Sequence, residues 1–313
     1  MTSEALTSLA QTHRELAAKR QPGEALVTVN HNDAGSTLLV VVDDTSFLVS
    51  SITAQIAAQW GGISGLIHPT FLVARNDAGE ITSLASAGFD QPVASGDTAV
   101  MPRIDQNKGE ACGTIIESWI AVQLTSRLNE EAGSTLEEEI QAVLVDVRHA
   151  SRDSDAMATR VLDIADRLTE LSGVTLGGSE HYTGELNSET DPATRVESVQ
   201  EFLRWLTRGN FLFMGVKERD LSERADQLVL SDRQGSALGI LAATEGNEPT
   251  VLTGLGLDNA REPKPLYVTK ANSRSTVHRH EYLDYIGVRD FDRSGAIVGE
   301  YVILGLFSRQ AYA

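Results

Sequence analysis

The spacing of apolar residues predicts alternating strands and helices in the first half of the chain. Residues 37–42 (TLLVVV) form an uninterrupted apolar run rich in β-branched side chains, which is typical of a core strand. A helical repeat follows over 47–60 and stops at two glycines. Further strands are predicted over 63–74, over 80–85 after a hairpin turn, and over 115–124.

Amphipathic helices flank and follow these strands. The first covers most of residues 1–20, and another is predicted to open at the capping-box sequence STLE, 134–137. Two more are predicted over 155–172 and over 191–210, the latter starting at Asp-Pro. Residues 86–113 show neither a helix nor a strand period and predict a long, mobile loop.

From residue 211 the pattern changes to strands separated by turn residues. The strand-like segments are FLFMGVKER, QLVLS, ALGIL, TVLTG, PLYVTKA, YIGVRDF and AIVGEYVILGLF. The charge changes at the same place: 14 basic and 30 acidic residues lie up to residue 210, against 12 and 14 after it. Both changes indicate a domain boundary near residue 210.

Composition narrows the class of protein. The chain has 313 residues and a formal charge of −18, and 41% of its residues are hydrophobic, which together indicate a globular protein of two domains. The acidic balance argues against nucleic-acid binding, and no apolar stretch is long enough to cross a membrane. A single cysteine, Cys112, excludes an internal disulfide, and the start of the chain has no secretory signal pattern. We therefore expect a cytoplasmic protein.

The turn after the first core strand is one candidate binding site. Asp43, Asp44, Thr45, Ser46 and Phe47 connect that strand to the N-terminus of the next helix. Backbone N–H groups and the positive end of the helix dipole at such a turn suit a carboxylate or phosphate ligand. Alternatively, the aspartates and the serine only cap the helix.

A basic segment, residues 264–280 (KPLYVTKANSRSTVHRH), is the other candidate. It holds four cations and no acidic residue, with short hydroxyl donors between them, so it could bind an anion or an acidic partner. The residues we expect to take part are Lys270, Ser273, Arg274, His278 and Arg279. Alternatively, the segment is a solvated strand that balances nearby acids.

The remaining candidates are weak. His68 lies in an apolar strand and is expected to be a hydrogen-bonded core histidine. Nothing near Cys112 in the sequence lowers the pKa of its thiol, and His278 and His280 lack a third metal ligand. No dinucleotide fingerprint, phosphate-binding loop or nucleophile elbow is present. We therefore expect no catalytic residue, no cofactor-binding residue and no metal site in this chain.

Several segments together resemble one family. They are VDDTSFLV at 42–49, LIHP at 66–69, FLRWL at 202–206, NFLFMG at 210–215, KANSRSTVHR at 270–279, DYIGV at 284–288 and LGLF at 304–307. This set is similar to the N-terminal region of the large bacterial NAD-specific glutamate dehydrogenases. The segments KANSRSTVHR and DYIGV are the specific part of the resemblance.

The resemblance implies an α+β fold with ACT-like and PAS-like modules. An N-terminal helix and linker (1–35) would precede an ACT-like βαββαβ domain (36–150), a helical connector (151–210) and a mainly β PAS-like domain (211–313). The turn at 43–47 would be the effector loop of the ACT-like domain. It lacks the glycine that lets a ligand approach the backbone closely, which argues against effector binding there.

The resemblance also implies a function. The parent enzyme would oxidise L-glutamate to 2-oxoglutarate and ammonium with NAD, and this chain would be a non-catalytic regulatory and oligomerisation segment without a cofactor of its own. Its partners would be the downstream catalytic region, further copies in a homotetramer and an amino-acid effector, with no nucleic acid and no membrane. The alternative is a free-standing sensor that binds an anion or an amino acid.

Overall fold

Contacts within the computed structural model divide the chain into two units, Met1–Val145 and Asp146–Ala313. Each unit is described by itself. The four-part division with boundaries at residues 36, 151 and 211 stays a prediction. The described residues are 3–32, 35–87, 114–170, 192–244, 249–253 and 265–312. Most of the predicted loop 86–113, with Cys112, therefore lies outside them, as does Lys264.

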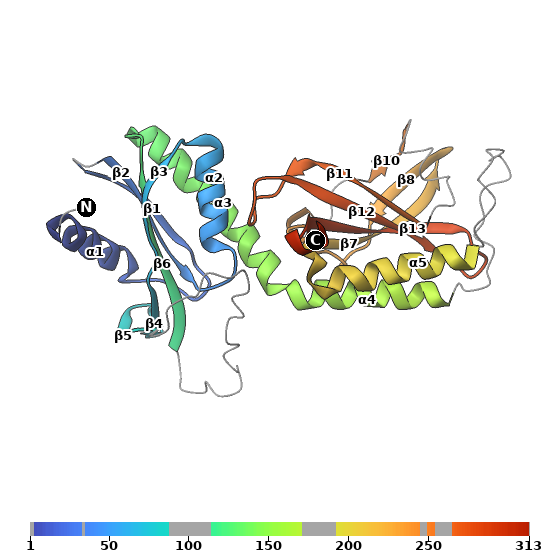
Figure 1. Cartoon of the computed structure of the whole chain (residues 1–313), viewed down its shortest axis with the longest axis horizontal. Coiled ribbons are helices and arrows are strands. Elements are labelled where there is room, and N and C mark those ends of the chain that lie inside the picture. The colour runs from blue at the N-terminus through green and yellow to red at the C-terminus, as the bar shows by residue number, and fades with distance from the viewer. Residues whose placement is uncertain are drawn as a thin grey trace. The chain divides into compact units, whose positions relative to one another are not determined.

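The first unit combines a six-stranded antiparallel sheet with helices (Figure 1). Its elements are α1 (Ser3–Ala17), β1 (Leu26–Asn32), β2 (Gly35–Asp43), α2 (Leu48–Gln59), β3 (Ile63–Ile67), β4 (Thr70–Arg75), β5 (Ile81–Ser86), β6 (Thr114–Leu124) and α3 (Glu130–Arg152). The strand order is β1-β2-β6-β4-β5, and β3 also pairs with β6. The strands predicted over 37–42, 80–85 and 115–124 and the first two predicted helices are thus confirmed.

Strand β2 is buried on both faces of the sheet. On one face Leu39 and Val41 pack against residues of α1, while α2 and α3 cover the other face (Figure 1). The alternate residues Leu38 and Val40 are also completely buried. A strand covered on both sides needs apolar side chains at every position, which explains the continuous run in the sequence.

The strand β1 was not expected, because its residues fall in the predicted linker of 1–35. It pairs with β2 over its whole length. Within residues 114–170, α3 is followed by another helix and not by the closing strand of the expected βαββαβ order. The edge position beside β2 is occupied by β1. The expected βαββαβ order is therefore wrong: the edge strand precedes β2 in the chain and does not follow the last helix.

The predicted start of α3 at the capping box is also wrong. The helix begins at Glu130, where the Asn129 side chain accepts a hydrogen bond from the N–H of Ala132 at 2.9 Å. Glu137, the acidic member of the capping box, instead accepts a hydrogen bond from the backbone of Val29 at 2.6 Å. The Glu137 side chain, which the sequence predicts to cap the start of the helix, thus bonds to β1 instead.

The strand expected over 63–74 is two strands, β3 and β4. His68 and Pro69 lie between them, and both strands pair with β6. Proline has no N–H to donate to a ladder, so the strand breaks there.

The second unit is a seven-stranded antiparallel sheet with helices on one face (Figure 1). Its elements after α3 are α4 (Ser154–Thr169), α5 (Pro192–Trp205), the π-helical turn η2 (Leu206–Asn210), β7 (Phe211–Arg224), β8 (Gln227–Asp232), β9 (Leu238–Gly239), η3 (Ala242–Thr244), β10 (Thr250–Val251), β11 (Leu266–Arg274), β12 (Tyr282–Phe291), β13 (Ile297–Phe307) and η4 (Arg309–Tyr312). The order is β10-β8-β7-β13-β12-β11, with β9 paired to β7. The mainly β character predicted from residue 211 is confirmed.

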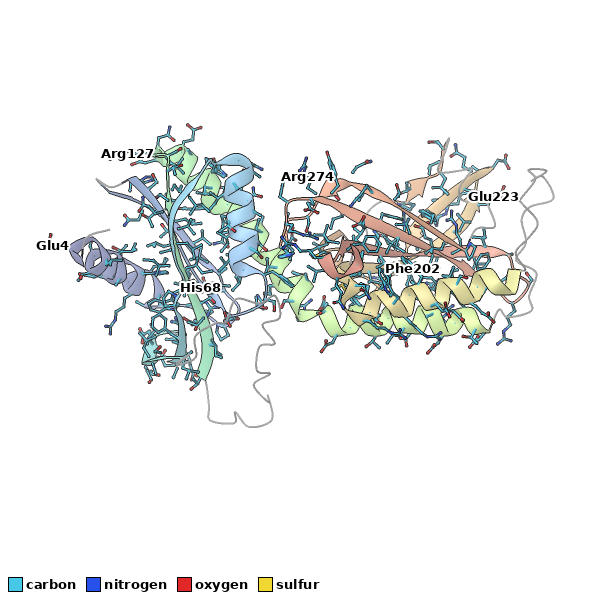
Figure 2. The ribbon with its side chains drawn as sticks, viewed as in Figure 1. Glu4, His68, Arg127, Phe202, Glu223 and Arg274 are labelled. Carbon is cyan, nitrogen blue, oxygen red and sulfur yellow. The ribbon has the colours of Figure 1, made fainter. Side chains whose placement is uncertain are left out.

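Helices α4 and α5 form the core of this unit with the sheet. Val161 and Ile164 of α4 and Leu203 of α5 pack in one buried cluster with strand residues such as Ile286 and Ile303. The labelled Phe202 packs against the same cluster (Figure 2). Among the described residues, no helix is both long and apolar enough to pass through a lipid bilayer.

Candidate functional site

The five residues of the predicted effector turn lie between β2 and α2. Asp43 Oδ1 accepts a hydrogen bond from Arg20 Nη2 at 2.5 Å, and Asp44 Oδ1 accepts one from Ser118 Oγ at 2.5 Å. Thr45 and Phe47 are half-buried and Ser46 is exposed. The residue before the helix is Phe47, in the left-handed conformation with φ 70°, and its side chain provides no cap hydrogen bond. Both carboxylates are thus held by side chains of their own unit.

Asp43 belongs to a buried ion cluster. Arg20, which is fully buried, also donates from Nη1 to Glu117 Oε1 at 2.8 Å. Arg75 donates to both oxygens of Glu117, at 2.8 and 3.0 Å. Burial by itself raises the pKa of Glu117, but the hydrogen bonds from Arg75 and Trp119 and the charges of both arginines outweigh it and hold that pKa below its usual value. The cluster fixes the end of β2 from which the effector turn leaves.

His68 is not a core histidine, which corrects the sequence-based expectation. The residue is exposed, in the loop between β3 and β4, and is labelled in Figure 2. Its Nε2 lies 2.8 Å from Ser118 Oγ, the hydroxyl that donates to Asp44. The Ser118 hydroxyl therefore lies within hydrogen-bond distance of both the Asp44 carboxylate and the His68 ring.

The described part of the basic segment, 265–280, forms β11 and most of the hairpin loop that leads to β12. Lys270 Nζ lies 2.7 Å from Asp284 Oδ1, and Arg274 stacks on the Tyr282 ring at 4.5 Å, where β11 ends (Figure 2). Arg279 Nη2 donates to the carbonyl of Phe307 at 2.9 Å. Each of these three cations is thus directed to a different partner within the second unit.

The other predicted members of this site lie beside them. Ser273 is exposed on β11, while His278 is half-buried in the hairpin loop with φ 68°. Burial and the neighbouring charge of Arg279 lower the pKa of His278, which favours the neutral ring. The structure therefore brings these residues together in one hairpin. Their contacts within the second unit explain the basic residues as structural, and the binding role stays a prediction.

A pocket of about 490 Å³ lies on the second unit's sheet, on the face opposite α4 and α5. We call it the sheet pocket. One row of paired residues crosses four strands beneath it: Lys217 of β7, Val302 of β13, Gly287 of β12 and Tyr267 of β11. Sequence reasoning named only Lys270 of the lining residues, because the others come from separate strands and only the strand register brings them together.

Two cations of the sheet pocket share one carboxylate. Lys217 Nζ lies 2.9 Å from Asp232 Oδ2, and Arg219 Nε lies 3.4 Å from Asp232 Oδ1. The side chains of Lys217 and Arg219 are only 14% and 17% exposed, and that of Asp232 is 7% exposed. The three groups are thus largely withdrawn from water and carry one surplus positive charge.

Two stacked tyrosines form the other side of the pocket. The rings of Tyr267 and Tyr285 have centroids 5.8 Å apart, and the Tyr285 hydroxyl donates to Glu300. Glu300 also pairs with Arg289 at 3.1 Å, and the Arg289 guanidinium lies 4.9 Å from the centre of the Tyr267 ring. Burial first, and then the charge of Glu300, raise the pKa of both tyrosines, so both hydroxyls stay protonated at neutral pH.

Residues 1–140 match the family described as "Glutamate dehydrogenase, ACT1 domain". The chain is also 24% identical over 280 residues to the NAD-specific glutamate dehydrogenase of Halomonas elongata, and 25% identical over 276 residues to that of Pseudomonas aeruginosa. A third relative, from Mycobacterium tuberculosis, has the same name and is 25% identical over 300 residues. The chain is thus similar to the N-terminal region of NAD-specific glutamate dehydrogenases.

The match to these dehydrogenases is extensive in this chain and small in theirs. It covers 88%, 87% and 95% of the chain, but only 15%, 15% and 16% of the three relatives. The resemblance expected from the sequence is thereby confirmed. Within the described part of the chain, no three His, Cys, Asp or Glu side chains gather closely enough to hold a metal ion.

Proposed function

We propose that this chain is a regulatory and assembly segment of an NAD-specific glutamate dehydrogenase. The observation that carries the proposal is the match of residues 1–140 to an ACT1 domain of glutamate dehydrogenase, within a chain that spans only about 15% of its relatives. In the parent enzyme, L-glutamate, NAD and water would give 2-oxoglutarate, ammonium and NADH. NAD and the substrate would be bound by a part of the parent that this chain does not include.

We also propose that the second unit is PAS-like. Its five long strands are arranged as β8-β7-β13-β12-β11, with helices packed on one face and the sheet pocket on the other. A sheet with helices on one face and a pocket on the other can bind a small ligand, which suits a regulatory segment.

The purified chain is expected to show no NADH formation from L-glutamate and NAD. The motifs that bind a dinucleotide are absent from its sequence. The assay measures absorbance of NADH, with the full-length parent as the positive control. Turnover by the purified chain that is proportional to its concentration would contradict the proposal.

Deleting the segment that corresponds to this chain from the parent enzyme tests its assembly role and its regulatory role separately. We expect the shortened enzyme to keep glutamate-dependent NADH formation but to change its mass in solution or its response to effectors. Light scattering after size exclusion measures the first, and initial rates with and without added amino acids measure the second. An enzyme unchanged in both respects would show that the segment neither assembles nor regulates it.

A further inference from the structure

We propose that the sheet pocket binds a small organic carboxylate with a planar, apolar body. This goes beyond the assembly role, because it assigns a ligand class to residues outside the effector turn and outside the β11–β12 hairpin loop. The pocket is lined by Lys217, Arg219, Leu241, Tyr267, Thr269, Lys270, Ala271, Asn272, Tyr285, Val302 and Leu304. Its size is within the range usual for small-molecule sites.

Charge selects an anion. Lys217 and Arg219 share the single carboxylate of Asp232, whereas Arg289 is matched by Glu300 and Lys270 by Asp284. Among the described residues that line the pocket and their ion-pair partners, one positive charge is therefore left over, in a chain whose net charge is −18. In a partly desolvated site, a ligand with one negative charge restores neutrality, while a polyphosphate would introduce a large excess of negative charge.

The two glycines beneath the pocket select its shape. A Cβ atom at Gly287 would lie 2.2 Å from Cζ of Tyr267, and one at Gly215 would lie 2.7 Å from Cγ of Leu241. Glycine at these positions therefore lets the tyrosine ring and the leucine side chain lie directly on the sheet backbone. The pocket between them has aromatic and aliphatic surfaces, with Val302 and Leu304 buried in its floor.

These two features lie side by side. Lys217 and Val302 are direct neighbours across β7 and β13, and Val302 is in turn paired with Gly287, on which Tyr267 lies. A ligand carboxylate at Lys217 and Arg219 would thus place its apolar body over Val302 and toward the tyrosines. Charge-assisted hydrogen bonds would fix the acid group, and apolar contact would fix the rest.

The test uses the whole chain and phenylacetate as the probe. Saturation-transfer NMR should detect binding of phenylacetate. In competition, its uncharged analogue phenylacetamide should bind at least about tenfold more weakly, because it lacks the charge-assisted hydrogen bond. Equal binding of the acid and the amide would overturn the proposal, and so would absence of binding by the acid.

Three variants locate the site. Lys217→Met should weaken phenylacetate binding by about tenfold, whereas Arg204→Met, which removes a charge from α5, should leave it unchanged. Thr269→Trp keeps both cations but fills the pocket from an exposed strand position, and should abolish binding. Thermal unfolding checks that each variant is folded. Binding that survives in both folded pocket variants would place the ligand elsewhere and overturn the proposal.

This result is independent of the assembly role. Phenylacetate binding is measured on the chain alone, so it stands whether or not deletion of the segment changes the parent enzyme. Conversely, loss of binding would leave the proposed assembly role open to its own test.

Discussion

Replacing Glu117 by glutamine is expected to lower the free energy of unfolding of the first unit by about 3–5 kcal/mol. Glu117 is fully buried and accepts hydrogen bonds from Arg20, Arg75 and Trp119. Glutamine keeps the shape but removes the charge that compensates two buried guanidinium groups. Asp43 remains as a partner of Arg20 and limits the loss.

The measurement should be specific to the first unit, because a chain of two units need not unfold in one step. Hydrogen exchange of peptides from β2 and β6, followed in increasing urea, reports this unit alone. The control is Glu15→Gln on the exposed side of α1, where the carboxylate contacts only Gln11 in the hydrogen bonds observed and the cost should stay within about 0.5 kcal/mol. Equal losses in the two variants would show that the cluster adds no stability.

The same carboxylate gives a pH dependence. Because the pKa of Glu117 is lower in the folded than in the unfolded chain, its contribution is present above the unfolded value, near 4.5, and is lost as pH falls through the folded value. The native first unit should therefore lose stability more steeply than Glu117→Gln below about pH 4.5. Parallel pH profiles of the two proteins would contradict this assignment.

Replacing Gly239 by alanine is expected to destabilise the second unit by about 2–4 kcal/mol. Gly239 has φ 64°, and a Cβ there would lie 2.1 Å from the carbonyl oxygen of Met214 and 2.9 Å from Sδ of Met157. Its N–H also donates to Asp153 at 2.9 Å. The methyl group would push β9 away from β7 and strain the link between this strand and the start of α4.

Gly235 provides a matched control. It also has a positive φ, 76°, but nothing lies within 4 Å of a Cβ built there. Gly235→Ala should therefore cost only the backbone strain, about 1 kcal/mol. Hydrogen exchange of β7 and β13 peptides in increasing urea measures the loss of stability in both variants. If the two alanines cost the same, packing against Met214 contributes nothing.

The sequence predicted most elements correctly where a local signal is strong. The apolar run 37–42 is a buried strand, and the helical repeats after Phe47 and after Ser154 form α2 and α4. Sequence-based prediction was wrong where a contact with a distant part of the chain outweighs the local sequence preference. Glu137 bonds to β1 and not to its own helix start, and β1 itself is stabilised by pairing with β2.

The candidate sites show the same difference. The effector turn was found because its residues are adjacent in the chain, but its carboxylates contact Arg20 and Ser118, which lie far away in the sequence. Of the residues that line the sheet pocket, sequence reasoning named only Lys270 as a candidate. The lining residues are spread between positions 217 and 304, and the register of four antiparallel strands brings them together.

By itself, the sequence determined the alternation of helices and strands, the change to a β-rich half near residue 210, and the relationship to a dehydrogenase through short specific segments such as DYIGV at 284–288. These depend on local periodicity and residue identity. Only the tertiary structure decided the place of β1, the buried position of Glu117 and the convergence of Lys217 with Tyr267. The physical reason is that pairing register, burial and shared charge arise between residues distant in the chain, and no window of sequence contains both partners.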